Sequence, residues 1–126
     1  MQSVVRALAV CGLIVGLVAT ASPVGADGYF ATDAQYAHPR QYTNEVIWVA
    51  LCDDPFCDFP QVGVPVHTVW NYRTDTPTLD WQTGSDGMAA MTRNIGPATC
   101  GFTVRVDIYV GDEQTQIDSA YFTPAC

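Results

Sequence analysis

The stretch from Cys100 to Cys126 constrains the fold of this chain more than any other part of the sequence. Every second residue from Phe102 to Val110 is apolar, and the residues between them are mostly polar. This period of two places the apolar side chains on one face of a β-strand. Residues 111–114 (Gly-Asp-Glu-Gln) predict a turn, and residues 115–122 predict a returning strand. We therefore expect a β-hairpin with one buried face.

The cysteines after residue 26 number four, and an even number in an exported chain predicts two disulfide bonds. Four cysteines allow three connectivities. Pairing Val110 with Thr115 across the turn brings Cys100 and Cys126 almost opposite each other at the open end of the hairpin, where a disulfide can form. This register favours Cys100–Cys126 and leaves Cys52–Cys57 to close a short loop.

Residues 1–26 have the pattern of a secretory signal peptide. A single positive charge precedes the apolar run Ala7–Ala21, and Val24-Gly25-Ala26 is a small-residue cleavage site. The run is about fifteen residues long, whereas a membrane span needs ~20. We therefore expect export, removal of Cys11 with the signal peptide, a mature chain that starts at Asp27, and no membrane span in that mature chain.

The rest of the chain predicts one all-β domain. Residues 27–44 read as a polar lead-in with one short edge strand at most, and residues 45–126 as the domain itself. Residues 45–51 are apolar on both parities, which predicts a strand covered on both faces. The sequence Gly-Ser-Asp-Gly at 84–87 predicts a hairpin turn. No window shows a helical apolar period, and about seven short strands between turn signals predict a β-sandwich.

The charge of the chain limits its partners. Thirteen acidic residues stand against five arginines and no lysine, which gives a formal net charge of −8. This charge argues against nucleic acid and against an anionic membrane surface as partners. The lack of lysine removes Schiff-base chemistry.

Three motifs resemble those of bacterial Ig-like domains, the invasin and intimin type or related domains. They are the strand Val62–Val66 followed by Trp70, the turn Thr83–Ala89, and the strand Phe102–Val106. The resemblance extends from about Val46 to Phe122. It implies an Ig-like sandwich with a buried tryptophan, which we assign to Trp70, and binding or structural work without catalytic residues. The cysteine loop and the single copy depart from the family pattern.

The residues that carry chemistry in other proteins do not form a catalytic set here. His67 is expected on the polar face of its strand, far from His38, so no zinc site is predicted. Ser85 and Ser119 lack the Gly-x-Ser-x-Gly context of a nucleophile. We expect no catalytic residue, no cofactor and no metal centre. Whether the acidic residues of the cysteine loop bind calcium is left open, because their spacing does not match an EF-hand.

We expect a small secreted, non-enzymatic domain that binds an extracellular protein or cell-surface ligand. The disulfide loop is the candidate binding site, with the turns near Asp75 and Asp112 as further candidates, because the loops at the ends of a sandwich carry binding. The candidate residues of the loop are Asp53, Asp54, Phe56, Asp58 and Phe59. The alternatives are an enzyme inhibitor that presents the closed loop 52–57 and a small secreted hydrolase.

Overall fold

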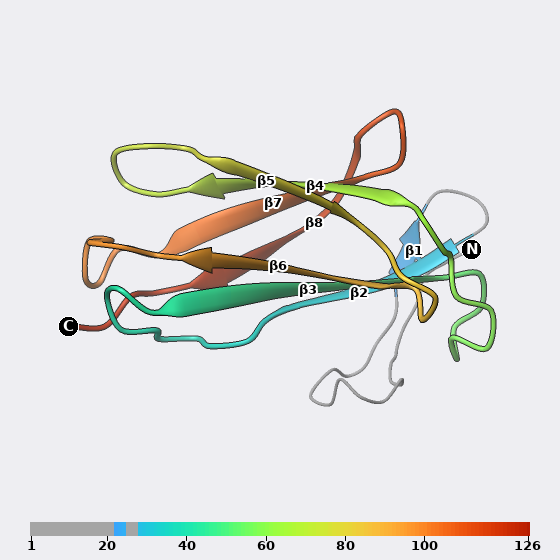
Figure 1. The fold of residues 1–126 in the computed structure, drawn as a ribbon, viewed down its shortest axis with the longest axis horizontal. Coiled ribbons are helices and arrows are strands. Elements are labelled where there is room, and N and C mark those ends of the chain that lie inside the picture. Colours follow the sequence, from blue (N-terminus) through green and yellow to red (C-terminus); the bar gives the residue numbers. More distant parts are fainter. Residues whose placement is uncertain (1–21, 25–27) are drawn as a thin grey trace.

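The computed structural model describes residues 22–24 and 28–126, which form two antiparallel sheets that pack face to face (Figure 1). The strand order is β1-β2-β3-β6 in the first sheet and β5-β4-β7-β8 in the second. No helix is present in these residues. The predicted all-β, Ig-like sandwich of about seven strands is confirmed, and β1 is a three-residue addition to it. The strands are β1 (Ser22–Val24), β2 (Gly28–Ala34), β3 (Asn44–Cys52), β4 (Pro65–Asn71), β5 (Thr78–Gln82), β6 (Met88–Asn94), β7 (Val104–Val110) and β8 (Thr115–Phe122).

The turn at 84–87 joins the two sheets. We expected it to close a hairpin, and this prediction is wrong, because β5 pairs with β4 while β6 pairs with β3. The turn itself forms: the Gly87 amide donates to the Gly84 carbonyl at 2.9 Å, and Gly87 has a φ of 75°. Asp-Gly chemistry determines the tight reversal, but it does not determine whether the next strand pairs with the previous one.

The segment expected to be a lead-in contributes to the sandwich. Strand β2 pairs with β3 from Tyr29 to Ala34, and Phe30 belongs to the core. The sandwich therefore includes a strand ahead of the expected boundary at residue 45. The predicted signal peptide, residues 1–26, lies outside the described residues except for β1, which pairs with the start of β2.

The core lies between the sheets and is centred on Trp70, which is fully buried as predicted. Its ring packs against Phe122 at 5.9 Å and against Tyr72 at 6.5 Å between centroids. The Trp70 indole Nε1 donates to Thr68 Oγ1 at 2.9 Å, and this hydroxyl donates to the Leu79 carbonyl at 2.8 Å. The buried polar atoms of both side chains are therefore satisfied within the core.

Strand β3 is covered less completely than expected. Ile47 and Val49 are fully buried between the sheets, but Val46 and Trp48, on the opposite parity, are only half-buried. Burial on both parities begins at Ala50. The expectation of two covered faces therefore holds for the last part of the strand alone. The inward parity also places Glu45 inside the sandwich, where it is 0% exposed.

The β7–β8 hairpin is confirmed, and it contains a bulge that the sequence did not reveal. Val110 pairs with Thr115 as expected, but the register shifts by one residue between Ile108 and Tyr109. This shift moves the open end of the hairpin by one position and brings Cys100 and Cys126 into line. Both predicted disulfides are present, with Cα–Cα distances of 5.5 Å for Cys100–Cys126 and 5.1 Å for Cys52–Cys57.

Replacing Cys100 and Cys126 together by serine should lower the free energy of unfolding by about 3 kcal/mol, because the disulfide closes a long loop in the unfolded chain. Urea denaturation measures this loss. The matched control replaces Cys52 and Cys57, whose sequence separation is 5 rather than 26. The control should lose about 2 kcal/mol, since its loop is shorter. A larger loss in the control than in the hairpin pair would contradict the assignment of Cys100–Cys126 as the main stabilising bond.

Candidate functional site

The predicted binding loop joins β3 to β4 at one end of the sandwich, to the right in Figure 1. Cys52, the last residue of β3, is bonded to Cys57 and pairs with Pro60 in an isolated antiparallel bridge. Within this closure the Asp53 amide donates to the Phe59 carbonyl at 2.8 Å. The loop therefore doubles back on itself and is closed at its base by one covalent bond and by backbone hydrogen bonds.

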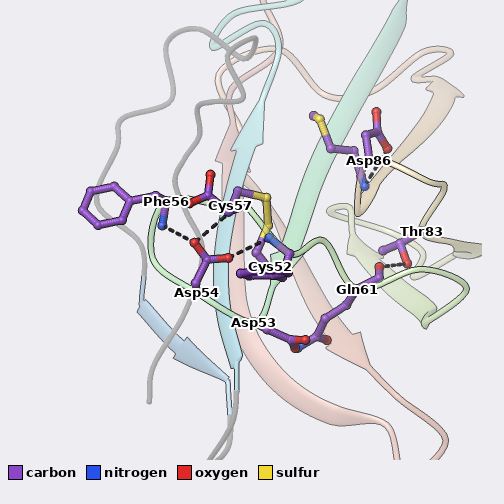
Figure 2. Close-up of a disulfide and its surroundings, with 11 residues drawn as sticks. Cys52, Asp53, Asp54, Phe56, Cys57, Gln61, Thr83 and Asp86 are labelled. Atoms are coloured by element: carbon purple, nitrogen blue, oxygen red, sulfur yellow. Dashed lines mark hydrogen bonds between the residues drawn. A yellow bond between two sulfur atoms is a disulfide. The ribbon is translucent and has the colours of Figure 1, made fainter.

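The carboxylate of Asp54 organises the tip of the loop (Figure 2). Its Oδ2 accepts from the amides of Phe56 at 3.2 Å and Asp58 at 3.0 Å, and its Oδ1 accepts from the amide of Phe59 at 2.8 Å. Asp53 Oδ1 accepts from Gln61 Nε2 at 2.9 Å. Asp54 thus holds the loop backbone in shape, whereas Asp53 binds the side chain of Gln61. Within residues 22–24 and 28–126, no three His, Cys, Asp or Glu side chains are grouped so that they could hold a metal ion.

The base of the loop is fixed to the turn at 84–87. The Leu51 amide donates to the Gly87 carbonyl at 2.8 Å. A Cβ at Gly87 would lie 2.5 Å from the Leu51 carbonyl oxygen and 2.8 Å from the Pro60 Cβ, so no larger residue fits. Thr83 Oγ1 donates to the Gln61 carbonyl at 2.6 Å (Figure 2). The loop is therefore attached to a second chain segment on both sides.

The loop presents apolar side chains to solvent. Phe56 is 80% exposed, Phe59 is 66% exposed and Val62 is 62% exposed. The tip is turned rather than extended: the Cys57 amide donates to the Asp54 carbonyl at 3.2 Å, and Cys57 has a φ of 60°. The candidate residues of the loop thus lie together on one rigid tip.

The other predicted candidates lie apart from this tip or beside it. Asp112 lies in the β7–β8 turn at the same end of the sandwich, whereas Asp75 lies in the β4–β5 connection at the opposite end (Figure 1). His67 contacts the carboxylate of Asp80 and lies 5.9 Å from the Tyr109 ring. Ser119 instead donates to Asp107, so His67 and Ser119 are bound to different aspartates and do not pair with each other.

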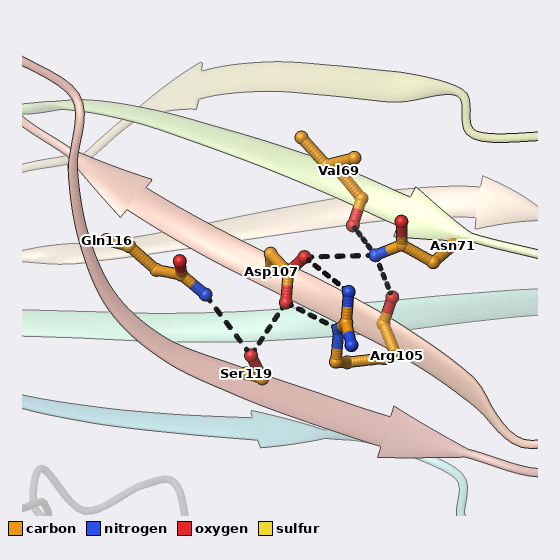
Figure 3. Close-up of polar contacts among 6 residues, drawn as sticks. All are labelled: Val69, Asn71, Arg105, Asp107, Gln116 and Ser119. Atoms are coloured by element: carbon orange, nitrogen blue, oxygen red, sulfur yellow. Dashed lines mark hydrogen bonds and ion pairs between the residues drawn. The ribbon is translucent and has the colours of Figure 1, made fainter.

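A polar network that we did not predict lies on the outer face of the second sheet (Figure 3). Asp107 is 8% exposed and accepts from Ser119 Oγ at 2.8 Å, Arg105 Nε at 2.9 Å and Asn71 Nδ2 at 3.1 Å. Burial acts to raise the pKa of Asp107, but these hydrogen bonds and the Arg105 charge outweigh it, so the pKa is lowered. The network ties β4, β7 and β8 together.

Glu45 is a second buried acid that we did not single out. Its Oε1 accepts from the amides of Tyr36 at 2.9 Å and Val46 at 3.0 Å. Its Oε2 has no hydrogen-bond partner in the described part of the chain. Burial raises the pKa of Glu45, and the Asp33 charge acts in the same direction against the two amides. The alternation of the strand could have predicted this burial, because Glu45 lies two residues before Ile47 and therefore on the same, fully buried face of β3.

Comparison with known protein families, with curated proteins and with solved structures gave no match to this chain. The resemblance to bacterial Ig-like domains therefore stays a prediction. What the fold defines is an Ig-like β-sandwich with two disulfides, in which β5 belongs to the second sheet. In the constant-type immunoglobulin arrangement, the corresponding strand joins the first sheet.

Asp107→Asn should lower the free energy of unfolding at pH 7 by about 2 kcal/mol, because it removes the charge that several donors share. The folded-state pKa is lowered, so this stabilisation is present at neutral pH and is lost as pH falls through the lowered pKa. The difference between wild type and variant in urea denaturation should therefore shrink at acid pH. Asp112→Asn, in an exposed turn, is the control and should change stability little at either pH.

Glu45→Gln should raise the free energy of unfolding at pH 7 by about 1 kcal/mol. Glutamine keeps a carbonyl oxygen for the two amides and removes a charge that is disfavoured by burial. Because the folded-state pKa is raised, the gain should shrink as pH falls through that pKa and the wild-type carboxyl becomes neutral. Denaturation at a series of pH values measures this, with the exposed Glu113→Gln as control. A loss of stability at pH 7 would mean that the ionised carboxylate has a compensating partner.

Proposed function

We propose that this chain is a small extracellular, non-enzymatic binding domain that engages a protein partner through Phe56 and Phe59. The observation that carries the proposal is the combination of high exposure and rigidity at the loop tip. The two rings are 80% and 66% exposed. The amides of both residues donate to Asp54, which lies within the loop closed by the Cys52–Cys57 disulfide. A preorganised aromatic tip binds with a small ordering cost and is typical of interface hot spots.

The acidic loop residues suggest the kind of surface that the partner offers. Asp53 and Asp58 are exposed beside the two rings, and the chain has a formal net charge of −8. An apolar pocket with basic residues at its rim would complement both features. Such a complex should associate more slowly at high salt, since the charges at the rim steer the encounter.

The cysteine chemistry supports an extracellular location. Two disulfides fit an oxidising environment, and none of the described residues lies in a helix that could cross a membrane. We further propose that residues 1–26 are removed during secretion, which would also remove β1. Strand β2 would remain paired with β3, and Thr32 would still donate to Asp118 of β8.

The inhibitor alternative fits the loop less well than simple binding. A protease cleft takes an extended segment, which pairs with it like a β-strand. The tip instead turns at residues 54–57, where Cys57 has a positive φ of 60°. A hydrolase would need converging titratable groups in a pocket. His67 and Ser119 are instead held by different aspartates.

Phe59→Ser and Phe56→Ser should each reduce binding of the labelled protein to the surface of the cells that secrete it by about tenfold or more. Tyr42→Ser is the matched control, because Tyr42 has the same 66% exposure as Phe59 but precedes β3 at the opposite end. All three variants should keep the wild-type melting temperature, since each ring is exposed. Equal binding by the two phenylalanine variants and wild type would rule out the loop as the binding site.

A further inference from the structure

The end of the sandwich opposite the binding loop contains a cavity of about 320 Å³. It lies between the β4–β5 connection and the β6–β7 connection, which both reach the left side of Figure 1. Its apolar wall consists of Ile95, Pro97 and Ala98. Its polar lining includes Tyr72, Arg73, Asp75, Arg93, Asn94 and Thr99. A volume of this size suits a small organic molecule.

The wall of the cavity is held in place by hydrogen bonds from neighbouring segments. The Tyr42 amide donates to the Gly96 carbonyl at 2.8 Å, and Gln41 Nε2 donates to the Ala98 carbonyl at 2.8 Å. On the other side, the Tyr72 amide donates to the Asp75 carbonyl at 2.9 Å. Thr99 is followed directly by Cys100, which is bonded to Cys126. The cavity is therefore formed before any ligand arrives.

Two buried donors at this wall have no hydrogen-bond partner among the residues that the structure describes. They are the Tyr72 hydroxyl and the Arg93 Nε, and the Arg93 guanidinium carbon lies 5.9 Å from the centroid of the Tyr72 ring. Buried donors are normally paired, so these two groups are suited to donate to the acceptor atoms of a ligand. The cavity also gathers two of the four arginines among the described residues, in a chain whose net charge is −8.

We propose that this cavity binds a small organic monocarboxylate. The carboxylate accepts from the Tyr72 hydroxyl and Arg93 Nε, Arg73 provides a second positive charge at the exposed side, and the apolar body packs against Ile95, Pro97 and Ala98. Guanidinium groups and hydroxyls are the donors that proteins use for carboxylates.

The charge balance favours a single negative charge over two. Asp75 lines the cavity together with the two arginines. The Asp75 carboxylate offsets part of the positive charge of these arginines. A phosphate dianion would meet more repulsion than a carboxylate in this environment.

Titration of the ¹⁵N-labelled protein with benzoate tests the proposal. We expect saturable amide shifts in residues 72–75 and 94–99, and no saturable shift there with the neutral benzamide or with inorganic phosphate. Tyr72→Phe and Arg73→Gln should each weaken benzoate binding about tenfold. Arg40→Gln removes the same charge from an arginine outside the cavity and should change the affinity less than twofold.

The variants and the probes separate the possible failures. Arg73 is exposed, so its replacement leaves the fold intact even if Tyr72→Phe disturbs the aromatic core. No shift in either segment with benzoate, or equal affinity in wild type and Arg73→Gln, would overturn the proposal. Equal shifts with benzoate and phosphate would replace it with a general anion site. None of these results bears on the loop at the other end.

Discussion

The burial of Trp70 between the two sheets is the interaction on which the rest of the molecule depends. Two stacked sheets lie ~10 Å apart, and a large ring is needed to fill that space. Trp70 does so against Phe122 of β8, and its indole nitrogen is satisfied by Thr68 two residues earlier on the same strand. Strand β4 therefore supplies both the large ring of Trp70 and the hydroxyl of Thr68 that accepts from it. Because this packing fixes β4 against β7 and β8, it also fixes where the connections at the two ends begin.

The two ends of the sandwich are both stabilised by a disulfide and by hydrogen bonds, but one end presents an exposed loop and the other a cavity. Each end has a disulfide, and each has backbone groups that hydrogen-bond to side chains or to neighbouring segments. At the Cys52–Cys57 end these devices support a convex tip that carries two exposed phenylalanines. At the Cys100–Cys126 end they surround a cavity with charged and hydroxyl groups. A convex apolar tip suits a macromolecular surface, whereas a small polar cavity suits a small molecule.

Local patterns predicted the features that depend on neighbouring residues. The alternation from Phe102 to Val110 predicted β7, and parity placed Trp70 in the core. The features that the sequence did not predict depend on contacts between segments that are distant along the chain. The Asp-Gly turn at 84–87 has the same chemistry whether it joins paired strands or crosses between sheets.

In the candidate site, too, local patterns were predictable from the sequence and long-range contacts were not. The sequence indicated an exposed phenylalanine tip between two cysteines, but not that Asp54 would accept three backbone amides. Asp107 looked like one polar residue in an alternating strand, and its burial arises from side chains on β4 and β8 that lie far away in the sequence. The bulge next to Ile108 likewise emerged from pairing and not from a local turn signal.

Glu45 and Asp107 show how the donors around a buried carboxylate decide its effect on the fold. Both side chains are nearly inaccessible, at 0% and 8% exposure. Asp107 receives hydrogen bonds from a hydroxyl, an amide group and a charged guanidinium, and its pKa is lowered. Glu45 receives two neutral backbone amides on one oxygen and none on the other, and its pKa is raised.

Two neutral donors do not replace the hydration that a carboxylate loses on burial. An apolar residue at position 45 would nevertheless leave the amides of Tyr36 and Val46 unpaired, which also costs free energy. The glutamate therefore holds the start of β3 in place at the expense of an unbalanced charge, whereas the aspartate stabilises its sheet through its charge.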